Sequence, residues 1–300
     1  MMRFPEEYKS FFILLWRGIG LPCNEALSLP IPAEEWMSIY ETSRRQAVCG
    51  LVFSAVEELP STCGIPEDLF LIWQADVKRI EADFVKVGRV VAKQRTTWEK
   101  RGINAVLLKG LESADMYPVP ERRTSGDIDW WMPSGKDWDA AIEVLEDNGI
   151  DWTVDSDGDI RYCLGGVPVE HHHDGLPVQG ITGRLYLCCE HILKHAMVAG
   201  VGLKQVCDYF VALKAFEGRY DELAYYNLLE KGGLVKWEAA LRGLDPDLIR
   251  LVMYDGNMGI DKKRRYSGFF VRTRIFFRLC PGLFIKRWFG LIFGRIRRIL

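Results

Sequence analysis

Asp127 and Asp129 are the residues of this chain whose types and spacing most directly suggest chemistry. They belong to the segment 127–132, Asp-Ile-Asp-Trp-Trp-Met, which is typical of a β-strand and is followed by the turn-forming residues Pro-Ser-Gly. Because side chains two positions apart in a strand point to the same face, both carboxylates project together while Ile128 enters the core. Two such charges repel each other unless a cation lies between them, and Mg²⁺ binds through a few carboxylates together with substrate phosphates. The pair therefore predicts a metal site that holds a nucleotide.

A third carboxylate, Glu170, lies within a second strand-like segment, residues 167–172. Its neighbours Val169 and His171 must point to the opposite face of that strand. If this strand pairs with the strand that carries Asp127, Glu170 can reach a second metal ion. Three carboxylates can hold two ions about 4 Å apart, which stabilises both the attacking and the leaving oxygen in phosphoryl transfer. We therefore expect two ions, Mg²⁺ or Mn²⁺, bound by Asp127, Asp129 and Glu170.

Residues suited to binding phosphate precede the aspartates. Lys109 and Gly110 follow the apolar run 105–108, which we interpret as a buried strand that enters a turn. A glycine lets the backbone approach a phosphate closely, and a lysine reaches phosphate oxygens as a point charge. Directly before the two acids lies a cluster of hydrogen-bond donors, Arg122, Arg123 and Ser125.

Histidines beside Glu170 offer further metal ligands. The run 170–174 is Glu-His-His-His-Asp, and strand alternation places Glu170 and His172 on one face and His171 and His173 on the other. His172 is expected to contact the nucleotide or the metal ion at Glu170. The alternative is a zinc site, which would need ligands from elsewhere in the chain.

His191 and His195 are spaced i, i+4 and so share one face of a predicted helix. The segment between them lacks the glutamate of the HExxH metalloprotease motif, which disfavours a protease. Two interpretations stay open for this pair. They are either packing histidines or side chains on the acceptor side of the active site.

The elements that must position these residues form a small α+β unit between helical regions. Upstream, residues 33–58 and 67–101 carry apolar residues at helical spacing. After the strand at 127–132 we expect a helix over 136–148, a hairpin of strands 150–155 and 159–164 around an Asp-Gly turn, and the Glu170 strand. Downstream, helices are predicted over 182–198 and 202–217, with more helix to about residue 251. The predicted regions are an N-terminal helical region 1–101, a core 102–176, a helical domain 177–260 and a tail 261–300.

The segment 107–133, LLKGLESADMYPVPERRTSGDIDWWMP, resembles the polymerase-β-like nucleotidyltransferase superfamily, and the resemblance covers about residues 106–172 and extends more weakly into the helical segment that follows. More narrowly it looks like an uncharacterised bacterial branch with an LKG…Y…R…DID pattern, and it is similar to nucleotidyltransferase toxins with LKGG…R-x-S-x-DID. The resemblance implies an α+β fold, with a polymerase-β-like core and a small mixed sheet flanked by helical regions. By position it implies metal-binding and catalytic roles for Asp127, Asp129 and Glu170. It also implies nucleotide and phosphate contacts for Lys109, Gly110, Arg123 and Ser125.

The reaction that the resemblance implies is transfer of a nucleoside monophosphate from an NTP to an acceptor hydroxyl, with release of pyrophosphate. The acceptor is a protein, an RNA or a small molecule. Leu111 stands where the superfamily commonly has a glycine or a phosphate-binding serine. The alternative is therefore a catalytically weak or inactive nucleotide-binding or toxin-like module of the same fold.

The charge of the chain is distributed unevenly. The net charge is -2, yet residues 261–300 carry 12 Lys and Arg and one acidic residue, interleaved with aromatic side chains. This tail resembles a pair of amphipathic helices broken at Pro281-Gly282, and three partners stay open: the acidic body of the protein, a membrane surface or nucleic acid. A membrane-surface adaptor is thus a further alternative function.

The cellular setting is inferred from the cysteines and the hydropathy. None of the eight cysteines forms a CxxC pair, and neither a signal peptide nor a membrane-spanning segment is evident. We expect reduced thiols and a cytoplasmic protein, with peripheral contact to the inner membrane face if the tail binds lipid.

Overall fold

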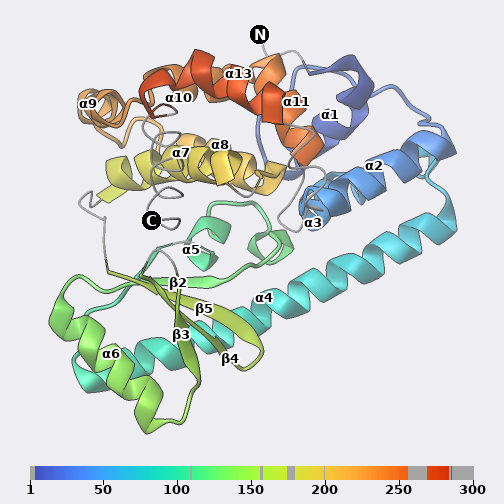
Figure 1. The fold of residues 1–300 in the computed structure, drawn as a ribbon. Helices are drawn as coiled ribbons and strands as arrows, with labels where there is room; N and C mark the ends of the chain where they lie inside the picture. Colours follow the sequence, from blue (N-terminus) through green and yellow to red (C-terminus); the bar gives the residue numbers. More distant parts are fainter. Residues whose placement is uncertain are drawn as a thin grey trace. The chain divides into compact units, whose positions relative to one another are not determined.

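The computed structural model describes residues 4–108, 110–155, 158–173, 180–198, 200–255, 269–283 and 285. The chain divides into two compact units (Figure 1). One unit, the sheet unit, comprises Ile13–Ser43 and Val48–Pro177, and the other, the helical unit, comprises Met1–Phe12, Arg44–Ala47 and Val178–Leu300. The α+β fold class predicted from the sequence is confirmed, because the sheet unit combines a mixed five-stranded sheet with helices.

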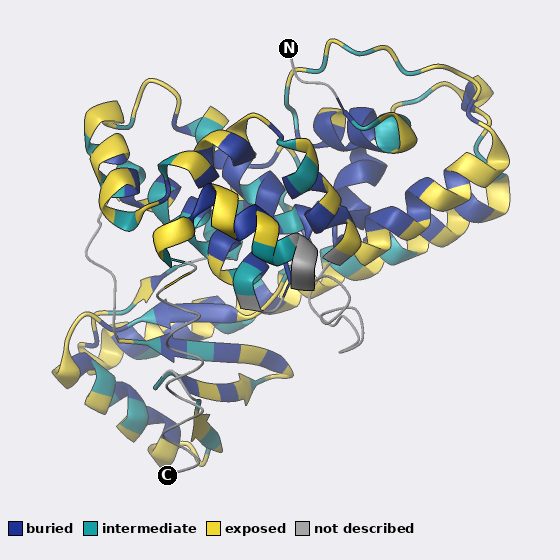
Figure 2. Ribbon diagram, turned by 45° about the horizontal axis from the view of Figure 1, so that its top comes forward, coloured by how far each residue is buried: buried dark blue, intermediate teal, exposed yellow. Residues whose placement is uncertain are grey.

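The longest helix, α4, spans Glu67–Arg101 and confirms the prediction for this segment to the residue. It begins after Pro66 and ends at Gly102, which adopts the left-handed conformation (φ 64°) that favours glycine at a helix C-terminus. Buried residues follow one side of the helix and exposed residues the other, as the colours of the ribbon in Figure 2 show. A single uninterrupted apolar stripe is thus enough to define this element.

The helical segment predicted over 33–58 is interrupted. It forms α2 (Ala33–Arg45) and α3 (Cys49–Val56). Ala47 has a left-handed conformation (φ 54°), and the N–H of Val48 donates to the carbonyl of Ser43 at 2.9 Å. This hydrogen-bonding pattern ends α2 in the manner of a Schellman cap. Ahead of α2, α1 spans Lys9–Gly18.

The sheet has the strand order β1-β2-β5-β4-β3. Its strands are β1 (Val106–Leu107), β2 (Ile128–Trp131), β3 (Trp152–Val154), β4 (Ile160–Leu164) and β5 (Val167–His172). The two central strands, β2 and β5, are parallel, and the other neighbouring strands are antiparallel. Between the strands lie α5 (Leu111–Ala114), the 3-10 helix η3 (Pro120–Arg122) and α6 (Gly135–Asp147). The predicted strands are therefore confirmed, although Val106 of β1 is exposed rather than buried.

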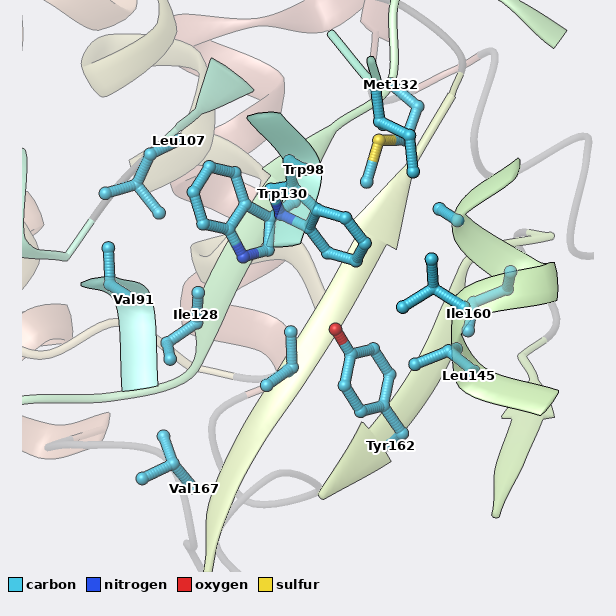
Figure 3. Close-up of a cluster of buried hydrophobic side chains, with 14 of the residues drawn as sticks. Val91, Trp98, Leu107, Ile128, Trp130, Met132, Leu145, Ile160, Tyr162 and Val167 are labelled. Atoms are coloured by element: carbon cyan, nitrogen blue, oxygen red, sulfur yellow. The ribbon is translucent and has the colours of Figure 1, made fainter. Parts of the chain in front are cut away.

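A hydrophobic core covers one face of this sheet (Figure 3). Its members from the sheet are the inward side chains of four strands: Leu107, Ile128, Trp130, Ile160, Tyr162, Val167 and Val169. Its members from helices belong to α4 and α6: Val87, Val91, Trp98, Ala141, Val144 and Leu145. Because both helices pack on the same face, side chains on the opposite face of β2 and β5 are left for other contacts.

A chain of hydrogen bonds runs through this core. The indole N–H of Trp130 donates to Gln94 Oε1 at 3.0 Å, and Gln94 Nε2 donates to the Tyr162 hydroxyl at 2.5 Å. The Tyr162 hydroxyl lies 2.7 Å from His171 Nε2. His171 is fully buried, and burial lowers its pKa to about 3, with a smaller contribution from the charge of His172. His171 is therefore neutral in the folded chain, and its Nε2 accepts a hydrogen bond from the Tyr162 hydroxyl.

The depressed pKa of His171 predicts a loss of stability in acid. Below pH 6.5 the unfolded chain binds a proton on His171 that the folded chain does not, so stability falls as the pH drops from about 6.5 towards 3, by about 1.4 kcal/mol per pH unit. His171→Gln keeps an acceptor for Tyr162 but cannot titrate. Urea denaturation between pH 8 and pH 5 should show the wild type losing about 2 kcal/mol more than this variant. Parallel curves for the two proteins would contradict the assignment.

The helical unit is built from helices downstream of the sheet. They are α7 (Gly180–Val198), α8 (Leu203–Ala215), α9 (Glu222–Gly232), α10 (Val235–Arg242), α11 (Pro246–Asp255) and α13 (Phe269–Leu279). The predicted helices over 182–198, over 202–217 and on to about 251 are confirmed. Among the helices that the structure describes, none has the length and hydropathy needed to span a bilayer.

The described part of the C-terminal tail packs on its own unit. Arg278 of α13 lies 2.7 Å from Asp245 Oδ1, and Arg272 donates to the carbonyl of Ala196 at 2.8 Å. Phe276 is buried, with its ring 6.1 Å from that of Trp237. For α13 these contacts favour docking on the body of the protein. The tail residues 261–268, 284 and 286–300 lie outside the described residues.

Candidate active site

The site predicted from the carboxylates lies on the sheet face opposite α4 and α6. Ile128 and Trp130 of β2 enter the core, so Asp129 between them points to the other face. In β5, Val169 and His171 are buried, which turns Glu170 and His172 to the same face as Asp129. The parallel register of the two strands places Asp129 directly opposite Glu170. Strand pairing thus brings together carboxylates that are 41 positions apart in sequence.

Three side chains form a compact ligand cluster on this face. His172 Nε2 lies 3.0 Å from Asp129 Oδ1 and 3.9 Å from Glu170 Oε2. One ligand atom from each of the three residues lies within 4.8 Å of the others. Asp129 is 2% exposed, so its charge has lost nearly all contact with water. A buried carboxylate needs a compensating partner, and oxygen and imidazole ligands at these separations suit a divalent cation.

Two further charged side chains contact members of the cluster. Asp159 Oδ2, from the residue just before β4, lies 2.8 Å from His172 Nδ1. Arg161 of β4 lies 3.2 Å from Glu170 Oε1 and 2.9 Å from Asp155 Oδ2. Neither residue was predicted from the sequence as a component of the site. Their contribution depends on the antiparallel register that sets Arg161 opposite Glu170, and this register becomes visible only once β4 and β5 are paired.

The pKa values of Glu170 and His172 reflect this crowding. Burial raises the pKa of Glu170, and the negative charges of Asp127 and Asp129 raise it further, against the opposing charge of Arg161. Burial alone would lower the pKa of His172. Hydrogen bonds and charges from Asp129 and Asp159 outweigh that effect, and the pKa of His172 is raised. The cluster therefore concentrates negative charge that a bound cation would stabilise.

The remaining residues predicted for the site have different surroundings. Asp127 precedes β2 and is exposed, yet its charge acts on Glu170. Gly110 has a φ of 84°, and a Cβ placed on it would lie 3.7 Å from the carbonyl oxygen of Asp127, so the turn after β1 lies against the start of the DxD segment. Ser125 is half-buried two residues before Asp127. Lys109 lies outside the described residues.

The two arginines of the predicted donor cluster have different surroundings. Arg123 is buried, whereas the guanidinium of Arg122 turns to α3 and α4. Arg122 forms a bidentate ion pair with Glu57 and a hydrogen bond of 3.1 Å to Glu81. The hydrogen bond with Glu57 raises the pKa of Arg122, and burial opposes this rise only in part. Arg122, which the sequence places in a local donor cluster but which the resemblance does not assign to phosphate binding, has its donors committed to these two glutamates.

Arg122→Ala is expected to destabilise the fold. The variant leaves Glu57 and Glu81 without their shared cation, and we expect the free energy of unfolding to fall by about 2 kcal/mol. Chemical denaturation measures the change, and a double-mutant cycle with Glu57→Ala isolates the pair, with an expected coupling of about 1 kcal/mol. Unchanged stability together with weakened nucleotide binding would show instead that Arg122 is a phosphate ligand.

The histidines predicted as ligands occupy separate environments. His172 joins the carboxylates, His171 is part of the core, and the ring of His173 lies 4.3 Å from that of Trp138. The alternative of a zinc site formed by this trio is therefore not supported by the described residues. His191 and His195 pair their rings at 4.1 Å on α7 in the helical unit, and their role on the acceptor side stays a prediction.

Comparisons with known proteins add one finding. A family model described as an uncharacterised nucleotidyltransferase matches residues 32–184, slightly more than half of the chain. The match spans α2 to the beginning of α7 and so includes all five strands and the ligand cluster. Neither a curated protein nor a solved structure matches the chain.

Proposed function

Because the chain belongs to this family of uncharacterised nucleotidyltransferases, we propose that it transfers a nucleoside monophosphate from an NTP to an acceptor hydroxyl and releases pyrophosphate. One observation carries the proposal: Asp129 and Glu170 stand opposite each other on the polar face of β2 and β5, with Asp127 two residues before Asp129. This is the set of carboxylates that a divalent ion beside a phosphate requires.

The residues present fit a divalent metal centre. Asp127, Asp129 and Glu170 would hold the ions, Mg²⁺ or Mn²⁺, and the raised pKa of Glu170 supports a need for positive charge at this position. When bound, such ions neutralise the triphosphate and stabilise the charge that develops on the oxygens during transfer. The acidic cluster would otherwise repel the substrate.

The remaining groups bind and orient the reactants. Glu170, whose pKa is raised by burial and by Asp127, is suited to accept the proton of the acceptor hydroxyl. Gly110, beside the Asp127 backbone, lets phosphate oxygens approach the turn after β1, with Lys109, Arg123 and Ser125 as further phosphate contacts. Catalysis of this kind depends on positioning and charge stabilisation rather than on a covalent intermediate.

Position-specific labelling tests the proposal. The purified chain is incubated with Mg²⁺ or Mn²⁺ and NTP labelled at either the α- or the γ-phosphate, in the presence of protein, RNA and small-molecule acceptors. Nucleotidyl transfer labels the acceptor from α-labelled NTP alone and releases pyrophosphate, whereas phosphoryl transfer would label it from the γ position. Asp139→Asn, an exposed carboxylate on α6, serves as the control variant and should retain activity.

The same assay distinguishes the alternative of an inactive module. If the chain binds NTP but labels no acceptor in the panel, and if it releases no pyrophosphate, then a nucleotide-binding function without turnover replaces the proposal. Leu111 after the glycine turn is the residue that would account for such an outcome, because it supplies no hydroxyl to a phosphate.

A further inference from the structure

We propose that His172 is a nitrogen ligand of the metal centre, oriented by Asp159, and that the centre consequently takes Mn²⁺ in preference to Mg²⁺. The inference rests on the proposed function, since it concerns the same metal site. It adds a nitrogen ligand to the three carboxylates. This ligand gives the site a preference between Mn²⁺ and Mg²⁺.

The contacts of the imidazole ring support a ligand role. Nδ1 lies 2.8 Å from Asp159 Oδ2, and an ionised carboxylate can only accept a hydrogen bond. Asp159 thus holds a proton on Nδ1 and fixes the plane of the ring. The other nitrogen, Nε2, points at Asp129 and Glu170. Histidines that bind metals usually donate their second N–H to a carboxylate in this way, which sets the tautomer and strengthens the ligand.

The separations within the cluster agree with shared coordination. His172 Nε2 and Asp129 Oδ1 are 3.0 Å apart. Neighbouring ligand atoms around an octahedral ion with bonds of about 2.1 Å are themselves separated by about 3 Å. The pair that is joined by a hydrogen bond can therefore accommodate a cation with little rearrangement of either side chain.

The nitrogen ligand sets the preference among metals. Mg²⁺ demands oxygen ligands and strict octahedral geometry, whereas transition ions accept imidazole readily. Mn²⁺ matches Mg²⁺ in charge and also accepts carboxylates and phosphates. A centre with Asp129, Glu170 and His172 in its first coordination sphere should accordingly bind Mn²⁺ at least tenfold more tightly than Mg²⁺.

Electron paramagnetic resonance of the full chain with Mn²⁺ alone tests the proposal without an activity assay. Electron spin-echo modulation of the bound Mn²⁺ should show coupling to a ¹⁴N nucleus, and incorporation of ¹⁵N-histidine should replace it with ¹⁵N coupling. His172→Gln should abolish the coupling, while His173→Gln should retain it. In titrations, His172→Gln should remove most of the preference for Mn²⁺ over Mg²⁺, and Asp159→Asn should weaken Mn²⁺ binding about tenfold.

The outcomes separate this inference from the proposed function. Mn²⁺ that binds the wild type and is lost in Asp129→Asn, yet shows no nitrogen coupling, overturns the role of His172 and leaves the carboxylate site standing. Absence of any Mn²⁺ binding overturns both. The wild-type spectrum shows whether a histidine nitrogen binds the Mn²⁺, and comparison of His172→Gln with His173→Gln identifies that histidine as His172. Absence of nitrogen coupling in the wild type overturns the proposal whether or not the variants fold.

Discussion

Asp129→Asn is expected to lower nucleotide transfer by about 10³-fold or more while the protein stays folded. Asparagine has the shape of aspartate but not its charge, so the change removes the metal ligand whose carboxylate is most buried, at 2% exposure. Loss of one group that stabilises charge in a water-excluded site lowers rates by about 10²–10³-fold, and loss of a metal ion would lower them further. Initial rates with α-labelled NTP measure the effect.

The stability of the same variant distinguishes a catalytic defect from a folding defect. Burial raises the pKa of Glu170, and the charges of Asp127 and Asp129 raise it further. Removal of one of these charges should therefore leave the free energy of unfolding unchanged or raise it. Thermal denaturation without added metal measures this, with Asp139→Asn as the control. Retained activity in a well-folded Asp129→Asn protein would contradict the metal-binding role.

The polar face of the site was predictable from strand alternation alone. Alternation in β2 turns Asp129 away from the buried Ile128 and Trp130, and alternation in residues 167–172 separates Glu170 and His172 from the buried His171. Asp127 precedes β2 and is exposed, so its place beside Asp129 stays a prediction. Pairing of these two strands was not predictable, because the residues between them include a helix and a hairpin whose packing is set by the core. Asp159 and Arg161 were missed for the same reason. Their contacts depend on the register of β4 against β5 and on no local pattern.

The fold shows the same division between local and tertiary information. A continuous apolar stripe bounded by Pro66 and Gly102 defines α4 completely. The break between α2 and α3 has no comparable signal, because Ala47 occupies a left-handed conformation that the sequence would lead one to expect of glycine. Tertiary structure imposes this conformation against the local preference.

Arg122 shows where proximity in sequence misleads. It lies five residues before Asp127, in the donor cluster noted in the sequence, but its long side chain reaches away from the aspartates. Its partners Glu57 and Glu81 are 65 and 41 positions away; Glu57 directly follows α3, and Glu81 belongs to α4. Their position follows from the packing of η3 against these two helices.

Gly50→Ala is expected to be strongly destabilising because of the same packing. Gly50 lies at the start of α3, and a Cβ on it would lie 2.4 Å from the carbonyl oxygen of Arg122 in η3. The oxygen belongs to the backbone of η3, and the backbone of α3 fixes the position of the Cβ, so neither atom can move aside without shifting a whole segment. Overpacking of this kind costs about 1–3 kcal/mol, and we expect a loss of about 3 kcal/mol despite the higher helix propensity of alanine. Urea denaturation of the full chain measures it.

Gly88→Ala provides the matched control. It separates the effect of the close contact at Gly50 from the general effect of replacing a helical glycine by alanine. Gly88 lies in the middle of α4 with nothing within 4 Å of an added Cβ, so alanine there should raise the free energy of unfolding by about 0.5–1 kcal/mol. Displacement of η3 should also shift the segment 123–127 that leads into the site, so Gly50→Ala should reduce transfer activity where Gly88→Ala does not. Equal stability of the two variants would mean that the backbones of α3 and η3 are not in contact. It would also contradict the proposal that packing of η3 against α3 and α4 positions Arg122 beside its two glutamates.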